Sequence, residues 1–321
     1  MHQPKFPTRI LSMLAAFATI LASSTLAEEA ARNTSLLDRT DVSFGASVFD
    51  ELDPITDPEG FAYAPSSPGD SDLGDQLILM TQGSYKPFSF RLTQDGIWTS
   101  NAGLTETDTF DDFYSRSEAA FSFIPRIAGN TYGEFNIDYS FFRYSDNSEL
   151  DFDSLEASVG AIHVFRGLND LSTWFRYNHI RLLDGRDHDE LFTDHTLEVG
   201  LYYPKLIGRK HLLFGSAASE FSLDGNPGFA RRHEHSATIG YTFFPTDRID
   251  LSTFYQFYVL DYTEDGRTDL LHTAGISATA QIRKGIELIL SGSYSINDSN
   301  IDGADYEVGD AGASISIEVQ F

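Results

Sequence analysis

The sequence predicts an all-β protein, a transmembrane antiparallel up-and-down β-barrel of 14 strands, with 12 strands as the alternative. Three observations lead to this fold class. From residue 41 to residue 321 the chain repeats one unit, a run of roughly 9 to 13 residues that alternates apolar with polar or small side chains, followed by a turn. The links between the runs alternate between short and long, and basic residues and prolines gather at the short links. This combination is typical of strands that connect two different compartments.

The last run shows the alternation most plainly. Ile315, Ile317 and Val319 fall on one face, and Ser316 and Glu318 fall on the other. A side-chain period of two indicates an extended strand with one apolar and one polar face. By the same criterion the predicted strands are 41–50, 76–85, 88–100, 117–126, 131–145, 154–165, 171–183, 195–205, 211–223, 232–244, 249–261, 269–282, 286–297 and 311–321.

The first two of these strands, 41–50 and 76–85, are the weakest predictions because they are short and frame the longest link. A single-chain bacterial barrel has an even number of strands, and both ends of the chain lie on the side of the short turns. The count of 14 meets both conditions. Without the first two strands, 12 remain, which is also even.

The links distinguish a membrane barrel from a soluble β-sandwich, in which strands alternate as well. The short link at 204–210 contains Lys205, Arg209 and Lys210, whereas the long link at 51–75 contains seven acidic residues and no Lys or Arg. A sandwich gives no reason for its two ends to differ in charge, but the ends of a membrane barrel face different compartments. Prolines also mark the short turns, where they leave every strand centre free to pair; they are Pro87, Pro125, Pro204 and Pro245.

The composition excludes several classes of protein. The 321 residues include 48 Asp and Glu against 22 Lys and Arg, a formal charge of −26, which is unsuited to binding nucleic acid. There is no cysteine, and hence no disulfide, thiolate nucleophile or Cys-ligated metal. With 26 Phe and 15 Tyr, the chain is too aromatic to be disordered.

The amino terminus has the pattern of a cleaved export signal over residues 1–27. Lys5 and Arg9 supply the positive region, residues 10–22 form an apolar core, and Thr25-Leu26-Ala27 is a small-residue cleavage site. The apolar core is too short for a transmembrane anchor, which needs about 18 residues or more. Residues 28–40 are predicted to be a short periplasmic lead, and residues 41–321 to be the barrel.

The carboxyl terminus is an alternating strand that stops on an aromatic residue, Ile315-Ser316-Ile317-Glu318-Val319-Gln320-Phe321. With this ending, the sequence resembles the bacterial outer-membrane β-barrels, whose last strand commonly ends in Phe. The resemblance implies that Phe321, Val319 and Ile317 form the signal read by the barrel-assembly machinery, and that the protein resides in the outer membrane of a Gram-negative cell. The opening, which runs from Val42 to Phe49 through an acidic link to Gln76–Tyr85 and a second hairpin, resembles the β-barrel porins of unknown substrate.

The polar face of each strand is expected to line the lumen, because Arg or Lys facing lipid costs roughly 2 to 4 kcal/mol at the bilayer midplane. The predicted pore-lining residues are Glu118, Glu134, Asn136, Asp138, Glu156, Glu198, Glu234, Glu287 and Glu318, with Arg91, Arg126, Arg232 and Arg283 as their counter-charges. The excess of carboxylates favours cations. The competing interpretation is that these residues pair across a narrow lumen and fill it.

No catalytic, metal or cofactor site is predicted. His233-Glu234-His235 is the one histidine cluster, and it lacks a third metal ligand at a recognisable spacing. The acidic links 184–190 and 302–310 have oxygen ligands but not the spacing of a calcium loop, so they are expected to be solvated surface. Bridging by divalent cations to lipopolysaccharide phosphates is a further hypothesis, which unchanged thermal stability on chelation would contradict.

The function expected from the sequence is a porin-like channel for passive diffusion of small hydrophilic solutes, favouring cations. The first alternative is a closed barrel with a structural or surface-interaction role through its acidic loops. The second is an outer-membrane lipid hydrolase. The expected partners are outer-membrane lipids, lipopolysaccharide, the assembly machinery and the solutes; nucleic acid is not among them.

Overall fold

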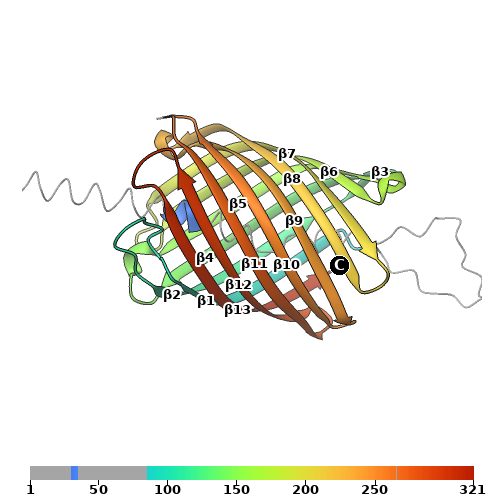
Figure 1. Ribbon diagram of the computed structural model, residues 1–321. Helices are drawn as coiled ribbons and strands as arrows, with labels where there is room; N and C mark the ends of the chain where they lie inside the picture. The colour runs from blue at the N-terminus through green and yellow to red at the C-terminus, as the bar shows by residue number, and fades with distance from the viewer. Residues whose placement is uncertain (1–29, 35–84, 265) are drawn as a thin grey trace, which may run out of the picture.

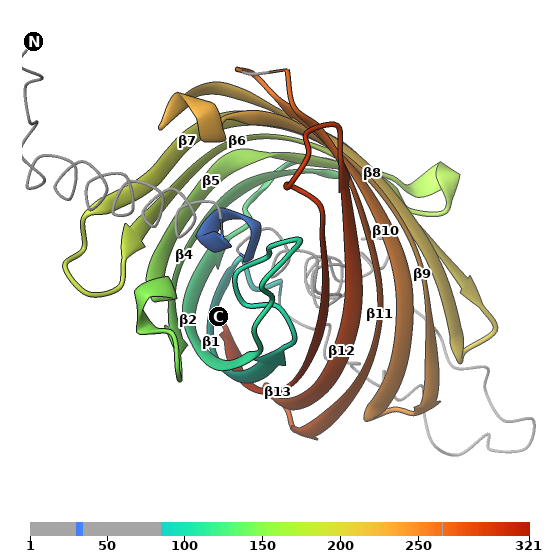
Figure 2. The ribbon, with the colours of Figure 1, turned by 60° about the vertical axis from the view of Figure 1, so that its left-hand side comes forward.

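The computed structural model describes residues 30–34, 85–264 and 266–321. Residues 85–321 form one antiparallel β-barrel, shown from the side in Figure 1 and from a view turned by 60° in Figure 2. Residues 30–34 form a single helical turn inside the ring of strands (Figure 2). Within the described parts of the chain, no helix has the length and apolar character that crossing a membrane requires.

The described sheet contains 13 strands in sequence order around the barrel. They are β1 (Phe88–Thr99), β2 (Asp112–Phe123), β3 (Arg126–Ala128), β4 (Thr131–Tyr144), β5 (Phe152–Phe165), β6 (Leu171–Asp184), β7 (Glu190–Ile207), β8 (His211–Asn226), β9 (Arg232–Thr246), β10 (Ile249–Tyr262), β11 (Thr268–Arg283), β12 (Ile286–Ser299) and β13 (Tyr306–Gln320). Three short 3-10 helices lie in the links: η1 (Ser148–Leu150), η2 (Arg166–Leu168) and η3 (Gly228–Ala230).

The ring closes over 12 of these strands. β1 pairs with β2 on one side and with β13 on the other, and β2 pairs directly with β4, so the short β3 lies outside the ring. At the seam, Phe88 and Phe321 exchange two backbone hydrogen bonds, N to O, of 3.2 and 3.0 Å. Closure leaves none of the 12 ring strands with an unpaired backbone edge, which a barrel in lipid requires.

The predicted count of 14 strands is therefore wrong, and the alternative of 12 is confirmed. Both edges of β1 are occupied by β2 and β13, which leaves no position in the ring for two further strands. The predicted strands 41–50 and 76–85, the long link 51–75 and the signal 1–27 lie outside the described residues. The 12 remaining predicted strands all occur in the structure.

Three strands begin five residues earlier than predicted, at the end of the barrel that carries the long links. β2 starts at Asp112, β7 at Glu190 and β13 at Tyr306. These extensions are rich in polar residues on both faces, and the alternation of apolar and polar side chains fades there. Their backbone pairing continues towards the long links, beyond the band of lipid-facing apolar side chains, where outward-facing side chains no longer need to be apolar.

Cross-strand register assigns each residue to one of two faces, because directly paired residues share a face. The outward face contains large exposed apolar side chains in mid-strand, such as Leu92, Val199, Ile239, Ile276 and Leu290. The inward face contains buried polar residues at alternate positions, such as Ser154, Ser172, Thr196, Thr273 and Ser295. The apolar face of the strands therefore points to lipid and the polar face to the interior, as expected from the sequence.

Candidate functional site: the barrel lumen

The register places most of the predicted lumen residues on the inward face. These are Arg91, Glu118, Glu134, Asn136, Asp138, Glu156, Glu198, Arg232, Glu234, Glu287 and Glu318. Arg126 and Arg283 lie apart from them at the short-turn end, where Arg126 is in β3 outside the ring and Arg283 follows an irregularity at the end of β11; both are exposed. Ile317, Val319 and Phe321 are exposed, and Ile317 and Val319 face outward at the end of β13.

Inward-facing carboxylates form two rows that run around the wall from strand to strand. In the first row, Glu198 on β7, Glu220 on β8 and Glu234 on β9 are direct cross-strand neighbours. In the second row, Asp138 on β4 pairs with Glu156 on β5, and the row continues through Ile180 on β6 and ends at Asp194 on β7. Because barrel strands are tilted, such rows climb the wall. Both rows rise towards the long-link end, where Glu234 and Asp194 lie.

Arg176 on β6 contacts the first row at Glu198, the member of the row nearest the short-turn end. Its Nε donates to Glu134 Oε2 at 2.9 Å, and its Nη1 lies 3.6 Å from Glu198 Oε2. The guanidinium also lies over the Trp174 ring, 5.1 Å from the centroid, and Trp174 Nε1 donates to Glu198 Oε1 at 2.7 Å. Burial and these two carboxylates enclose the Arg176 guanidinium, which leaves the residue only 7% exposed.

Gly160 on β5 makes this arrangement possible, because it lies between Glu134 and Arg176 in the register. A Cβ atom at this position would meet the carbonyl oxygen of Phe175 and would lie 2.9 Å from Cγ of Arg176. Arg176 therefore reaches Glu134 by passing over Gly160. The resulting ion pair joins β6 to β4, two strands that are not themselves paired. The sequence analysis identified neither Arg176 nor Trp174 as a site residue.

We expect Gly160→Ala to lower the free energy of unfolding by about 1–3 kcal/mol, because the added methyl group overpacks the contact between β5 and β6. Urea unfolding in lipid vesicles, followed by tryptophan fluorescence, measures this loss. The matched control is Gly292→Ala on β12, where the nearest atom to the new Cβ is a carbonyl oxygen at 3.6 Å. An equal loss in both variants would contradict the role assigned to Gly160.

The other inward guanidinium groups also pair along the wall. Arg116 contacts Asp95 on β1 and Glu118 on its own strand, Arg91 contacts Glu318 at 3.3 Å, and the remaining pair is Arg232 with Glu234 at 2.9 Å. Each pair joins residues on the same strand or on adjacent strands. Among the described strand residues, the ion pairs thus follow the wall and do not cross the lumen.

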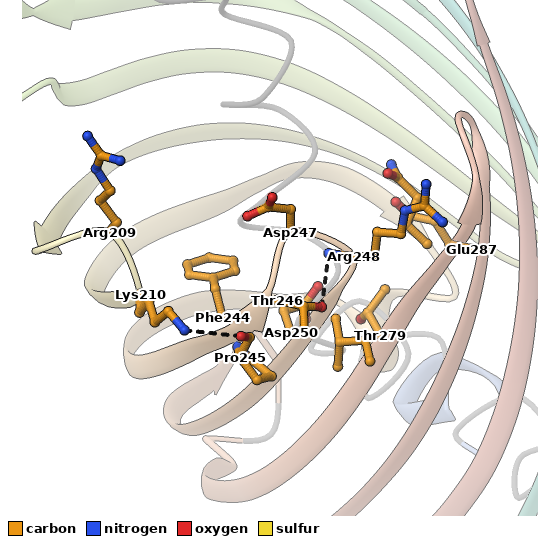
Figure 3. A pocket seen from close by; sticks show the side chains of 12 residues that line it. Arg209, Lys210, Phe244, Pro245, Thr246, Asp247, Arg248, Asp250, Thr279 and Glu287 are labelled. Atoms are coloured by element: carbon orange, nitrogen blue, oxygen red, sulfur yellow. Dashed lines mark hydrogen bonds between the residues drawn. The ribbon is translucent and has the colours of Figure 1, made fainter.

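The two ends of the lumen differ in width. A cavity of about 640 Å³ opens at the short-turn end, between the β8 end, the β9–β10 turn and β11–β12 (Figure 3). Its lining balances cations and anions: Arg209, Lys210 and Arg248 against Asp247, Asp250 and Glu287. Lys210 Nζ donates to the carbonyl of Pro245 at 3.2 Å within this cavity.

The long-link end is narrowed by inward-facing apolar side chains. One cluster includes Phe142, Phe152, Leu182 and Phe192 on β4 to β7, and a second lies across β10, β11 and β13. The sequence analysis missed these residues, because it assigned apolar side chains to the lipid face. Adjacent apolar doublets that interrupt the alternation are the signal that could have found them: Phe141-Phe142, Leu182-Leu183 and Leu270-Leu271.

Residues 30–34 narrow this end of the lumen further. Ala31 packs in the first apolar cluster, and Thr34 Oγ1 lies 3.5 Å from the hydroxyl of Tyr144. The space left between Thr34 and the surrounding wall is about 10 Å³, close to the size of one water molecule. Residues 28–40 were predicted to be a periplasmic lead, and five of them lie inside the barrel.

The histidines on the strands face outward, towards lipid or its interface. His233 and His235 point to the outward side of β9 while Glu234 points inward, as the alternation predicted. His235 Nδ1 lies 3.0 Å from Ser219 Oγ, but no carboxylate in the described part of the chain hydrogen-bonds to His235. The described residues contain no group of three or more His, Asp or Glu side chains placed to hold a metal ion.

Comparison with known proteins supports the fold. No protein-family model matches the sequence, and no curated protein matches it significantly. The structure is similar to the COG4313 outer membrane channel from Pseudomonas putida F1, with a TM-score of 0.53 and 9% identity over 74% of this chain and 99% of that one. Weaker matches include the KdgM porin, with a TM-score of 0.39 and 8% identity over 70% of this chain and 97% of that one. The chain thus has the fold of the outer-membrane β-barrel channels.

Proposed function

We propose that the protein is a porin-like channel for passive diffusion of small hydrophilic solutes and that it favours cations. The observation that carries this proposal is the direct adjacency of Glu198, Glu220 and Glu234 on three neighbouring strands. Like charges placed opposite one another destabilise a sheet. Three adjacent carboxylates on the inward face are the kind of fixed negative charge by which pores select ions.

The distribution of cations on the inward wall supports the same charge preference. In the described strands, the inward-facing guanidinium groups are Arg91, Arg116, Arg176 and Arg232, and no lysine faces inward in mid-strand. Each of these arginines is already engaged with a carboxylate. Solute cations would therefore meet a wall with an excess of negative charge.

A closed barrel with a structural or surface-interaction role is the second candidate function. The observation that favours it is the narrow end of the lumen, where the two apolar clusters and residues 30–34 leave little space. The acidic links at this end would then be the functional surface, through lipopolysaccharide or another partner. Conductance distinguishes the two functions, because only the first requires an open path.

The test is single-channel recording of the refolded mature protein in a planar bilayer, with the reversal potential measured under a salt gradient. We expect cation-selective steps, and we expect the combined substitutions Asp138→Asn, Glu156→Gln and Glu220→Gln to move the reversal potential towards zero. These three carboxylates are half-buried on the inward face, where they act on passing ions. The measurement also reports whether the lumen conducts at all.

The matched control removes the same number of negative charges from exposed links: Glu106→Gln, Asp187→Asn and Asp189→Asn. Charges in these links are screened by salt within roughly 10 Å at 0.1 M ionic strength, so we expect little change in selectivity. No conductance from a correctly folded, heat-modifiable barrel, whether unsubstituted or with the contacts of residues 30–34 to the wall removed, would refute the channel and favour the closed barrel. Equal shifts in the two triple variants would refute the assignment of selectivity to the wall.

The carboxyl-terminal strand is proposed to carry the assembly signal. Ile317, Val319 and Phe321 are exposed, and the Phe321 ring also stacks on Phe88 with the centroids 5.5 Å apart. Recognition of this strand by the assembly machinery would precede closure, because β13 must later pair with β1.

A further inference from the structure

Residues 30–34 form a compact element inside the lumen, at the long-link end (Figure 2). All five side chains are buried, although none belongs to a strand of the wall. If the chain is cleaved after Ala27 as predicted, only two residues precede this element. It would then be a nearly terminal segment, held in the barrel by its own contacts with the wall.

Arg32 occupies a site with the features of an organic-cation pocket. Its Nη2 lies 3.8 Å from Asp194 Oδ2 and 3.6 Å from Glu234 Oε1, and its guanidinium lies 4.3 Å from the centroid of the Phe192 ring. Two carboxylates beside an aromatic face are a favourable environment for a guanidinium group. Asp194 and Glu234 are also the members of the two carboxylate rows that lie nearest the long-link end.

The fit of Arg32 in this site is incomplete. Arg32 Nη1 and Asp194 Oδ2 are buried, and neither has a hydrogen-bond partner among the described residues. Burial and the nearby Arg232 lower the pKa of Arg32 to about 10, so the group remains charged at neutral pH. A free guanidinium, without the constraint of the helical backbone, could turn its planar fork to bond a carboxylate with two parallel hydrogen bonds.

Further contacts attach the segment to the wall, and in one of them Thr34 Oγ1 lies 3.5 Å from the Tyr144 hydroxyl. Arg232 Nη1 donates to Asn33 Oδ1 at 2.8 Å, and Ala31 packs among the apolar residues that narrow the lumen. None of these contacts is part of the strand pairing of the barrel. The segment therefore blocks the narrow end without being integral to the barrel.

We propose that residues 30–34 are a tethered plug, that Arg32 fills a guanidinium-binding site formed by Asp194, Glu234 and the Phe192 ring, and that free cations with a guanidinium group compete for this site. Displacement of Arg32 would release the plug and expose the ends of both carboxylate rows that lie nearest the long-link end. A tethered group has an effective concentration on the order of millimolar. The competing cation should therefore act in the millimolar range.

A labelling experiment tests the plug whether or not the barrel conducts. The chain has no cysteine, so Thr34→Cys introduces a single thiol, which a membrane-impermeant maleimide can modify. We expect slow labelling in this parent and about tenfold faster labelling when Arg32→Glu is added, since repulsion from Asp194 and Glu234 disfavours the docked state. Arg32→Gln, which removes the charge but keeps a polar side chain, should give an intermediate rate.

The matched control is Arg186→Glu in the exposed link at the same end of the barrel, where the charge change is identical. This variant should label as slowly as the parent. Arginine amide at millimolar concentration should accelerate labelling of the parent, whereas sodium chloride of equal ionic strength should not. Fast labelling of the parent would overturn the plug, and no effect of arginine amide would overturn the guanidinium site.

The consequence for conduction rests on the proposed channel function and is measured separately. Arg32→Glu should increase the open probability in a planar bilayer, and arginine amide should do so for the unsubstituted chain. If labelling shows a protected Thr34→Cys that Arg32→Glu releases, yet no variant conducts, then the plug holds and the channel function fails. Conduction of the unsubstituted chain and of Arg32→Glu at the same open probability would overturn the role of the plug in blocking the lumen.

Discussion

Arg232→Ala should lower the free energy of unfolding by about 3–5 kcal/mol, the range found when one partner of a buried ion pair is removed. Arg232 is 0% exposed and donates through Nε to Glu234 Oε1 and through Nη1 to the Tyr262 hydroxyl, both at 2.9 Å. Its loss removes a guanidinium 2.9 Å from the carboxylate of Glu234, which is 7% exposed, whereas the Arg32 guanidinium lies 3.6 Å away. Urea unfolding in lipid vesicles, read by tryptophan fluorescence, measures the change.

The preceding residue provides the matched control. Arg231 is partly exposed, and its guanidinium donates to Ser222 Oγ at 3.2 Å and to the carbonyl of Leu223 at 3.1 Å, without an ion pair in the described structure. We expect Arg231→Ala to change the stability by less than about 1 kcal/mol, the usual contribution of a single hydrogen bond. A loss in Arg231→Ala as large as that in Arg232→Ala would show that removal of any arginine at this strand start destabilises the barrel.

Ile276→Arg should destabilise the barrel in lipid by about 2–4 kcal/mol, because it places a guanidinium on the lipid face near the bilayer midplane. Ile276 lies in the middle of β11, is 66% exposed and belongs to the outward face by register with Thr253 and Gly292. Unfolding in vesicles and the yield of heat-modifiable protein both report this change. No interior contact is removed, so the loss measures the lipid exposure of this face.

The neighbouring substitution Ser277→Arg tests the face assignment directly. Ser277 is one residue further along β11 and points inward, between Ser252 and Ser291. An arginine there can reach the water and carboxylates of the lumen, so we expect a much smaller loss of stability. If Ser277→Arg destabilised the barrel more than Ile276→Arg, the inward and outward faces would have to be exchanged throughout β11, since a shift of one residue exchanges the faces.

The strands and their faces could be read from the sequence because alternation is a local property of extended chain. The run 286–297 was sufficient to predict β12, and the parity of Glu134, Asp138 and Glu198 placed them on the polar face without reference to any other strand. The ends of the strands were harder to predict from the sequence. The first residues of β7, from Glu190 to Asp194, alternate poorly, and only their pairing with β6 and β8 shows them to be strand.

The contacts between side chains within the lumen were beyond the reach of the sequence, although most of the lumen residues were predicted. Asp194 was not identified, Arg176 and Glu134 are 42 residues apart, and Arg232 meets Asn33 across a separation of 199 residues. No local pattern encodes these distances. Apolar doublets such as Phe141-Phe142 could have indicated the apolar residues at the long-link end, but that Phe142 and Phe152 are neighbours follows only from the pairing of β4 with β5.

The sequence by itself determined that this chain is a membrane barrel, where its strands run and which side chains alternate between lipid and lumen, because each of these depends on neighbouring residues and on the side-chain period of two. Only the tertiary structure decided that the ring closes over 12 strands, that the carboxylates form rows, and that Arg32 enters the lumen. These features depend on the register between strands and on the meeting of β1 with β13, segments separated by most of the chain. Register is set jointly by all the strands around a closed ring, so no single segment carries it.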